Sequence, residues 1–318
     1  MNRNYHIKER INLQISVISI WIFIYILSTF SRLEINFQSF SYIFYISASF
    51  YAIALLMILI KDKYVAPIAE ILGAGFAVLV PALIATYLAY SLDFPLADRQ
   101  LVEMDRALGF DWIAFIRFVD SSHWLSIYLE LAYASLKVQL VFVPVLLCCI
   151  GQVPRAIAYI FGYALMILVA STLAIPFPAL GTYSYYDFDV TTLQNIDAKF
   201  GYHFLDAFNA LRNDPSFILS GDDVVGIVTF PSVHAGMGFF TIWALWRTSW
   251  IKWPALVLNL SMAMSAVSHA NHYLVDVMAG LGIAVLVALT GSYVFLGFGP
   301  KKLSYRTSEV LTRNSRAS

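Results

Sequence analysis

The chain alternates long apolar runs with shorter polar connections. A helix needs roughly 20 residues to cross the hydrocarbon core of a bilayer, and runs of about this length lie at 11–30, 41–60, 66–90, 124–149, 156–180, 231–246, 253–267 and 272–298. The pattern predicts an all-α, polytopic membrane helical bundle with about eight transmembrane helices.

The composition supports this prediction. Of 318 residues, 60% are hydrophobic, 16% aromatic and 13% charged, a balance that would leave large apolar patches exposed on a water-soluble domain. Two cysteines exclude a disulfide scaffold. A nucleic-acid partner is not expected, and membrane lipids are the expected surroundings.

The distribution of charge predicts the orientation. If the N-terminus is cytoplasmic, the inner loops and tails hold 13 Lys/Arg and 3 Asp/Glu, whereas the outer loops hold 6 and 14. This Lys/Arg bias places both termini in the cytoplasm. The connections 91–123 and 181–230 then lie on the outer, or lumenal, side of a cell, inner or Golgi-type membrane.

These two outer loops differ in pattern. Apolar residues recur at near-helical spacing over 99–119, which predicts a helix lying along the interface. The second loop opens with aromatic residues around Tyr183 and ends near Asp222 and Asp223. Its role is left open between a cap over the bundle, a substrate contact and a plain connection.

Candidate chemistry lies at the outer ends of two apolar runs. Pro231 suits the first turn of a helix, where free backbone donors and the Ser232 hydroxyl would form an anion site. His234 in that turn would deliver a proton to a leaving oxygen. His272 and Asp276 are four residues apart, so one helix would place them on one face, with the carboxylate holding Nδ1–H and leaving Nε2 as a nucleophile.

Each element alone has a structural interpretation, because interfacial histidines often serve only as hydrogen-bonded or aromatic-belt residues. Their conjunction on one side of the membrane favours an active site. A transporter or scramblase, and a non-catalytic lipid-binding relative, remain alternatives.

The segment Pro231-Ser232-Val233-His234, together with Ser265 and His272-x-x-x-Asp276, resembles the second and third signatures of the type 2 phosphatidic acid phosphatase superfamily. It is similar in particular to the inositol phosphorylceramide synthase (inositolphosphotransferase) branch. The resemblance implies a six-helix phosphatase-type catalytic core over 66–298, two added helices within 1–65, and a basic cytoplasmic tail over 299–318.

The resemblance also implies roles for these residues. His272 would attack phosphorus to form a phosphohistidine, Asp276 would orient it, and His234 would protonate the leaving group. Substrate binding would fall to a second set of residues: Ser232, Pro231, His269 and Ser265. No metal and no other cofactor are implied.

The chain departs from the phosphatase pattern in its cations. Ala266 stands where the third signature usually has Arg, and 176–188 contains neither the Lys nor the Arg of the first. Because a phosphoryl anion needs compensating charge, substitutes are expected among His269, Lys199, Arg212 and an Arg of the first outer loop.

A polar stripe marks the fourth run, where Glu130, Tyr133, Ala134 and Lys137 share one helical face. The two interpretations are a Glu–Lys network that locks helices together and a lining for a lipid headgroup. Because Lys137 lies near mid-bilayer, far from the predicted outer site, the structural role is favoured.

The expected function is therefore transfer of a phosphoinositol-type headgroup from a phospholipid substrate to a lipid alcohol. Simple hydrolysis of phosphatidate or polyprenyl phosphate, with water as the acceptor, is the alternative. The missing cations favour a phosphodiester, which carries less charge than a terminal phosphate.

Overall fold

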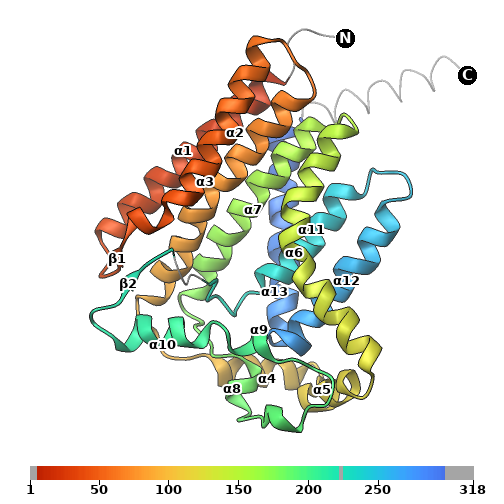
Figure 1. The fold of residues 1–318 in the computed structure, drawn as a ribbon. Coiled ribbons are helices and arrows are strands. Elements are labelled where there is room, and N and C mark those ends of the chain that lie inside the picture. The colour runs from red at the N-terminus through yellow and green to blue at the C-terminus, as the bar shows by residue number, and fades with distance from the viewer. Residues whose placement is uncertain (1–5, 222–224, 298–318) are drawn as a thin grey trace, which may run out of the picture.

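The computed structural model describes residues 6–221 and 225–297, and the described chain is mostly helical, with one pair of two-residue strands. Six helices are long and apolar enough to cross a membrane: α1 (Ile7–Thr29), α2 (Ser41–Leu59) with the 3-10 turn η1 (Phe37–Phe40), α3 (Val65–Tyr90), α6 (His123–Cys149), α7 (Val153–Ala174) and α13 (Leu274–Phe295). The chain is thus a polytopic membrane bundle (Figure 1). The predicted tail 299–318 lies outside the described residues, as do Asp222 and Asp223.

The other two predicted spans are present as shorter or more polar helices. α11 (Val233–Leu245) has 13 residues, about 20 Å at 1.5 Å per residue, against a hydrocarbon core of about 30 Å. α12 (Lys252–His269) has 18 residues but carries asparagine, serine and histidine side chains. Neither is among the six helices that meet the length and composition of a span.

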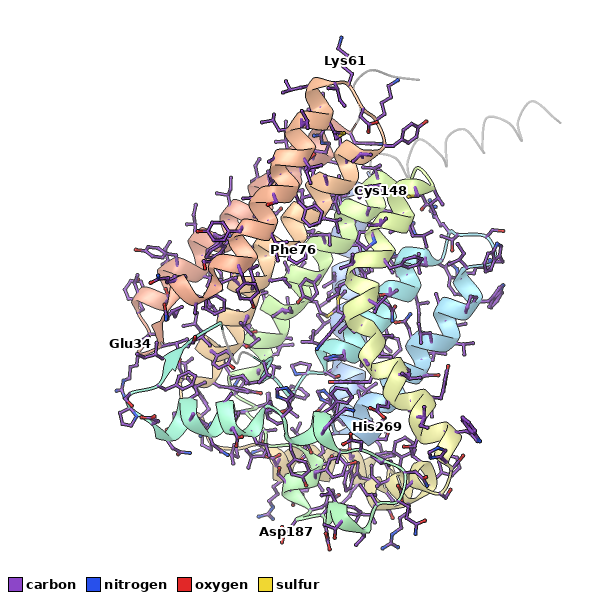
Figure 2. The ribbon with its side chains drawn as sticks, viewed as in Figure 1. Glu34, Lys61, Phe76, Cys148, Asp187 and His269 are labelled. Atoms are coloured by element: carbon purple, nitrogen blue, oxygen red, sulfur yellow. The ribbon has the colours of Figure 1, made fainter. Side chains whose placement is uncertain are left out.

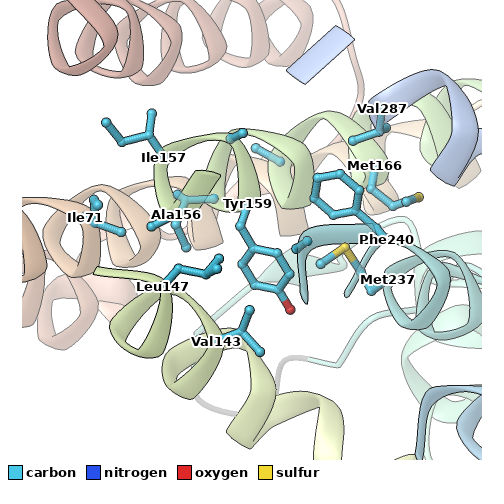
Figure 3. Close-up of a cluster of buried hydrophobic side chains, with 14 of the residues drawn as sticks. Ile71, Val143, Leu147, Ala156, Ile157, Tyr159, Met166, Met237, Phe240 and Val287 are labelled. Atoms are coloured by element: carbon cyan, nitrogen blue, oxygen red, sulfur yellow. The ribbon is translucent and has the colours of Figure 1, made fainter. Parts of the chain in front are cut away.

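α11 lies inside the bundle, in contact with α6, α7, α12 and α13. Its buried face carries Met237 and Phe240, and the Phe240 ring stacks on Tyr159 of α7 at 5.7 Å. The Tyr159 hydroxyl is hydrogen-bonded to Thr241 at 2.8 Å. Figure 3 shows this cluster, in which side chains of α6, α7 and α11 pack around Tyr159. The core therefore fixes where the first turn of α11 lies.

The N-terminal pair α1 and α2 packs beside α3 (Figure 1). Glu70 of α3, an acid within an apolar helix, forms an ion pair with Arg10 of α1 and accepts a hydrogen bond from Gln14 at 3.1 Å. Trp21 donates to the Ala77 carbonyl at 2.9 Å. Since an intramembrane carboxylate is costly without a partner, the Arg10–Glu70 pair helps to hold α1 against α3.

The two long loops that the sequence predicts, 91–123 and 181–230, fold in their described parts into a layer of short elements at one end of the bundle (Figure 1). They comprise α4 (Asp98–Ala107), α5 (Trp112–Asp120), α8 (Thr182–Tyr185), η2 (Val190–Thr192), α9 (Lys199–Tyr202) and α10 (Leu205–Asn213), and a two-residue strand β2 (Ile218–Leu219) that pairs in parallel with β1 (Glu34–Ile35). The single helix predicted over 99–119 is wrong, because Gly109 adopts a positive φ of 75° and separates α4 from α5.

The second loop is a cap and not a plain connection. Tyr183 is fully buried and donates a hydrogen bond to the Ser268 carbonyl at 2.6 Å. The Trp112 ring of α5 stacks on Tyr186 at 5.3 Å and meets Tyr183 edge-on at 4.9 Å. The aromatic cluster read from the sequence therefore joins α5 to the end of α12.

Candidate active site

His272 and Asp276 are joined by a hydrogen bond of 3.1 Å between Nδ1 and Oδ2. They do not share one helix as predicted: α13 begins at Leu274, so His272 precedes it and Asp276 lies in its first turn. The same Oδ2 accepts the Tyr273 N–H at 2.9 Å, which turns the chain so that the two side chains meet. Both are buried, at 4% and 0% exposure.

This pairing leaves the other ring nitrogen available. No hydrogen bond to Nε2 of His272 occurs within the described part of the chain. The carboxylate fixes Nδ1 as the protonated nitrogen, so the Nε2 lone pair is the nucleophilic position. Asp276 Oδ1 is buried and also lacks a partner among the described residues.

α11 docks directly on this pair. The Ser232 N–H donates to the Asp276 carbonyl at 3.1 Å, and the Ser232 hydroxyl caps α11 by accepting the Ala235 N–H at 3.3 Å. Gly280 makes the approach possible, because a Cβ there would lie 2.5 Å from the Ser232 carbonyl oxygen. The two motifs, 40 residues apart in sequence, are thus brought into backbone contact.

Pro231 lies one residue before the helix cap and not in the first turn, as the sequence had predicted. Ser232 takes the cap position with extended backbone, so Val233 is the first helical residue. Ser232 is fully buried and Pro231 is buried beside it. The first-turn donors of α11 remain the candidate anion site.

His234 is held by Tyr133 of α6. Its Nδ1 lies 3.2 Å from the Tyr133 hydroxyl, and the two rings stack at 4.1 Å. His234 is half-buried and lies within electrostatic range of His272. The structure therefore brings together the three predicted catalytic residues: His272, Asp276 and His234.

Two carboxylates of α4 brace the start of α13. Asp105 accepts the N–H groups of Leu274 and Val275, each at 2.9 Å. Asp98 accepts the Tyr273 hydroxyl at 2.8 Å and the Gly181 N–H at 2.7 Å. Burial raises the pKa of Asp105, against the lowering effect of its two backbone bonds.

Sequence reasoning missed this brace. Asp98 and Asp105 are seven residues apart, two helical turns, so they share one face of α4. Acids at that spacing beside buried Leu101 and Val102 are the signal that would have indicated them. Because Asp105 already accepts the first two N–H groups of α13, the candidate anion site is the first turn of α11 and not that of α13.

Asn271 holds the turn before His272. It adopts a positive φ of 69°, its Oδ1 accepts the Tyr183 N–H at 2.6 Å, and its Nδ2 donates to the Leu180 and Gly201 carbonyls. Asparagine tolerates this backbone region better than most residues. The loop that begins near residue 181 is thereby tied to the candidate nucleophile.

His269 and Ser265, both expected to bind substrate, are fully buried in α12. The His269 nitrogens lie 2.9 Å from the Ser268 hydroxyl and 3.4 Å from the Ser126 hydroxyl. The Ser265 hydroxyl donates to the Met262 carbonyl at 2.8 Å. These bonds give both residues structural partners beside the site, and Figure 2 shows His269 toward the end of the bundle where Asp187 lies.

Several of the cations expected to replace the missing arginine and lysine are already paired with acids. Carboxylates engage three of them: Lys199 with Glu130 (2.5 Å) and Asp197 (3.1 Å), Arg212 with Asp93 (2.7 Å), and Arg99 with Glu103 (3.0 Å). A substrate phosphate would have to compete with these acids for each cation.

A family model described as "PAP2 superfamily" matches residues 99–290, more than half of the chain. The matched segment contains α4 from its second residue onward, all of α11 and the His272–Asp276 pair. The chain belongs to the PAP2 superfamily. Membership supports lipid phosphatase or phosphotransferase activity. No curated protein and no solved structure matches the chain. The PAP2 match reaches the superfamily and does not extend to the inositol phosphorylceramide synthase branch.

Proposed function

We propose that this PAP2 protein is a lipid phosphotransferase or phosphatase that works through a phosphohistidine at His272. Nε2 attacks the phosphorus of a phospholipid, the bond from phosphorus to the leaving alcohol breaks, and His234 gives that oxygen its proton. A lipid alcohol or water then gives a proton to His234 as its oxygen attacks phosphorus. The P–N bond breaks and His272 is restored.

The observation that carries this proposal is the orientation of His272. Buried Asp276 holds Nδ1 at 3.1 Å, the nucleophilic nitrogen has no partner in the described structure, and the capped start of α11 docks on the Asp276 backbone. A carboxylate in this position also stabilises the positive charge that develops on the ring during attack. The Ser232 cap and the neighbouring first-turn N–H groups would receive the phosphoryl oxygens.

Trapping the intermediate tests the chemistry. Purified protein incubated with phosphorus-labelled phosphatidylinositol or phosphatidic acid should acquire label that survives alkali and is lost in acid. His272→Ala should abolish the label, and Asp276→Asn should reduce turnover on the order of 10³–10⁴-fold. His203→Ala is the matched control, since His203 is an exposed histidine of the outer layer.

Retention of the label in His272→Ala would refute the assignment of the nucleophile. Lipid binding without label on any histidine would instead support a non-catalytic relative or a transport protein.

For the donor, we propose a phosphodiester of the phosphatidylinositol type, with the phosphoinositol group passing to ceramide or another lipid alcohol. The support is the pairing of Lys199, Arg212 and Arg99 with carboxylates, which makes these three cations less available to a dianionic monoester. Appearance of a phosphoinositol-lipid only when ceramide is added would support transfer. Release of phosphate from phosphatidate or polyprenyl phosphate, with no transfer product, would support the phosphatase alternative.

We also propose that the site faces the outer or lumenal side and that both termini are cytoplasmic. Lys61 and Cys148 mark one end of the bundle and Asp187 the other, where the acidic outer layer lies (Figure 2). In a background lacking Cys148 and Cys149, Asp187→Cys should react with an impermeant thiol reagent in intact cells or sealed lumen-out vesicles, and Lys61→Cys should not. The reverse pattern would invert the topology.

A further inference from the structure

Lys137 of α6 has a setting that the sequence did not predict. It is exposed, and among the described residues no hydrogen bond or ion pair engages its ammonium. The carboxylate expected to pair with it, Glu130, binds Lys199 of α9 instead, at 2.5 Å. A lysine within an apolar span is costly unless an anion or water compensates its charge. This lysine therefore lacks the structural partner that would account for it.

Lys137 is not far from the candidate site, because α11 begins deep in the bundle. Tyr133, which contacts His234, lies ten residues beyond the start of α6, about 15 Å at 1.5 Å per residue. Because α11 is short, its first turn begins at this depth and not at the outer end of α6. Lys137 follows Tyr133 by one turn on the same face, and its charge lies within electrostatic range of His234.

We propose that the Lys137 ammonium binds the phosphate of the lipid substrate beside His234, and that its single positive charge matches a phosphodiester monoanion. Tyr133 positions the proton donor, and Lys137, one turn further along α6, supplies the charge that the Lys/Arg signatures lack. This inference rests on the proposed function and names the residue that would select its substrate class.

Because Lys137 is assigned to substrate binding and not to the chemical step, the test measures lipid binding by a protein that cannot react. Protein carrying His272→Ala is titrated with labelled phosphatidylinositol and with labelled diacylglycerol, which has no phosphate. Adding Lys137→Gln should weaken phosphatidylinositol binding roughly 10- to 100-fold, the range for one hydrogen bond to a charged group. Diacylglycerol binding should stay unchanged, and Lys137→Arg should restore phosphatidylinositol binding to within a few-fold.

Lys61→Gln is the control, since it removes an exposed lysine at the opposite end of the bundle (Figure 2). It should leave phosphatidylinositol binding unchanged. Equal binding by Lys137→Gln and its parent, or an equal loss of diacylglycerol binding, would overturn the inference. Lysine-dependent binding without any phosphohistidine in the otherwise unmodified protein would refute the proposed chemistry and leave the Lys137 assignment standing.

Discussion

Replacing Gly280 by alanine should separate the two halves of the candidate site. A Cβ at this position would lie 2.5 Å from the Ser232 carbonyl oxygen and 3.0 Å from the Gly236 nitrogen. These atoms are backbone and bond to each other at 3.0 Å, so neither can rotate away. α11 must therefore move away from α13, which strains the bond between the Ser232 N–H and the Asp276 carbonyl.

The expected cost follows from three terms. Overpacking costs about 1–3 kcal/mol, and loss of one backbone hydrogen bond about 1 kcal/mol. The gain in helix propensity from glycine to alanine offsets about 1 kcal/mol. The net destabilisation should be about 1–3 kcal/mol. A displacement of about 1 Å at a catalytic group would reduce turnover on the order of 100-fold.

Gly282 provides the control in the same helix, because a Cβ there meets no atom within 4 Å. Thermal unfolding in detergent and phosphohistidine labelling should both distinguish the two variants, with Gly282→Ala at least as stable as the parent. The packing argument would be refuted if Gly280→Ala kept full stability and labelling, or if Gly282→Ala were equally damaging.

Two further perturbations test the supporting structure. Burial disfavours ionisation of Asp120, but N–H bonds from the loop around Asn195 outweigh it and lower the pKa of this carboxyl. Asp120→Asn should therefore cost about 1 kcal/mol at neutral pH. A carboxyl whose pKa is lowered by folding stabilises the folded state above the ordinary aspartate pKa, and this stabilisation is lost as the pH falls through the lowered pKa. The difference in stability between Asp120→Asn and the parent should therefore shrink with falling pH. A pH-independent difference in melting temperature would contradict this. Arg10→Met should destabilise the bundle by about 3–5 kcal/mol by leaving Glu70 buried without its cation, whereas adding Glu70→Gln should recover most of the loss; additive losses in thermal unfolding would show that the pair is not coupled.

Local pattern was enough to predict much of the fold. Apolar runs of span length located the long helices, since a helix in lipid must satisfy its own backbone and present apolar side chains over its length. Helix ends were less predictable, because capping by Ser232 and Tyr273 moved the starts of α11 and α13 past Pro231 and His272. The break at Gly109 was missed because the apolar spacing continues across it.

Part of the candidate site could also be predicted from local sequence pattern. His234, His272 and Asp276 could be named because each pair of motif residues lies within one turn of chain, where spacing fixes geometry. The brace formed by Asp98 and Asp105 depends on contacts with residues more than 80 positions away, so spacing alone could not assign their partners.

The sequence by itself determined that this is a membrane bundle with two histidine motifs at the starts of apolar helices. Only the tertiary structure decided how the motifs meet, because the close approach of α11 to α13 depends on Gly280 lying opposite Ser232. It also decided that Glu130 pairs with Lys199, leaving Lys137 unpaired among the described residues. Pairing of charges depends on which helices are neighbours and at what depth they start, and neither is encoded in local spacing.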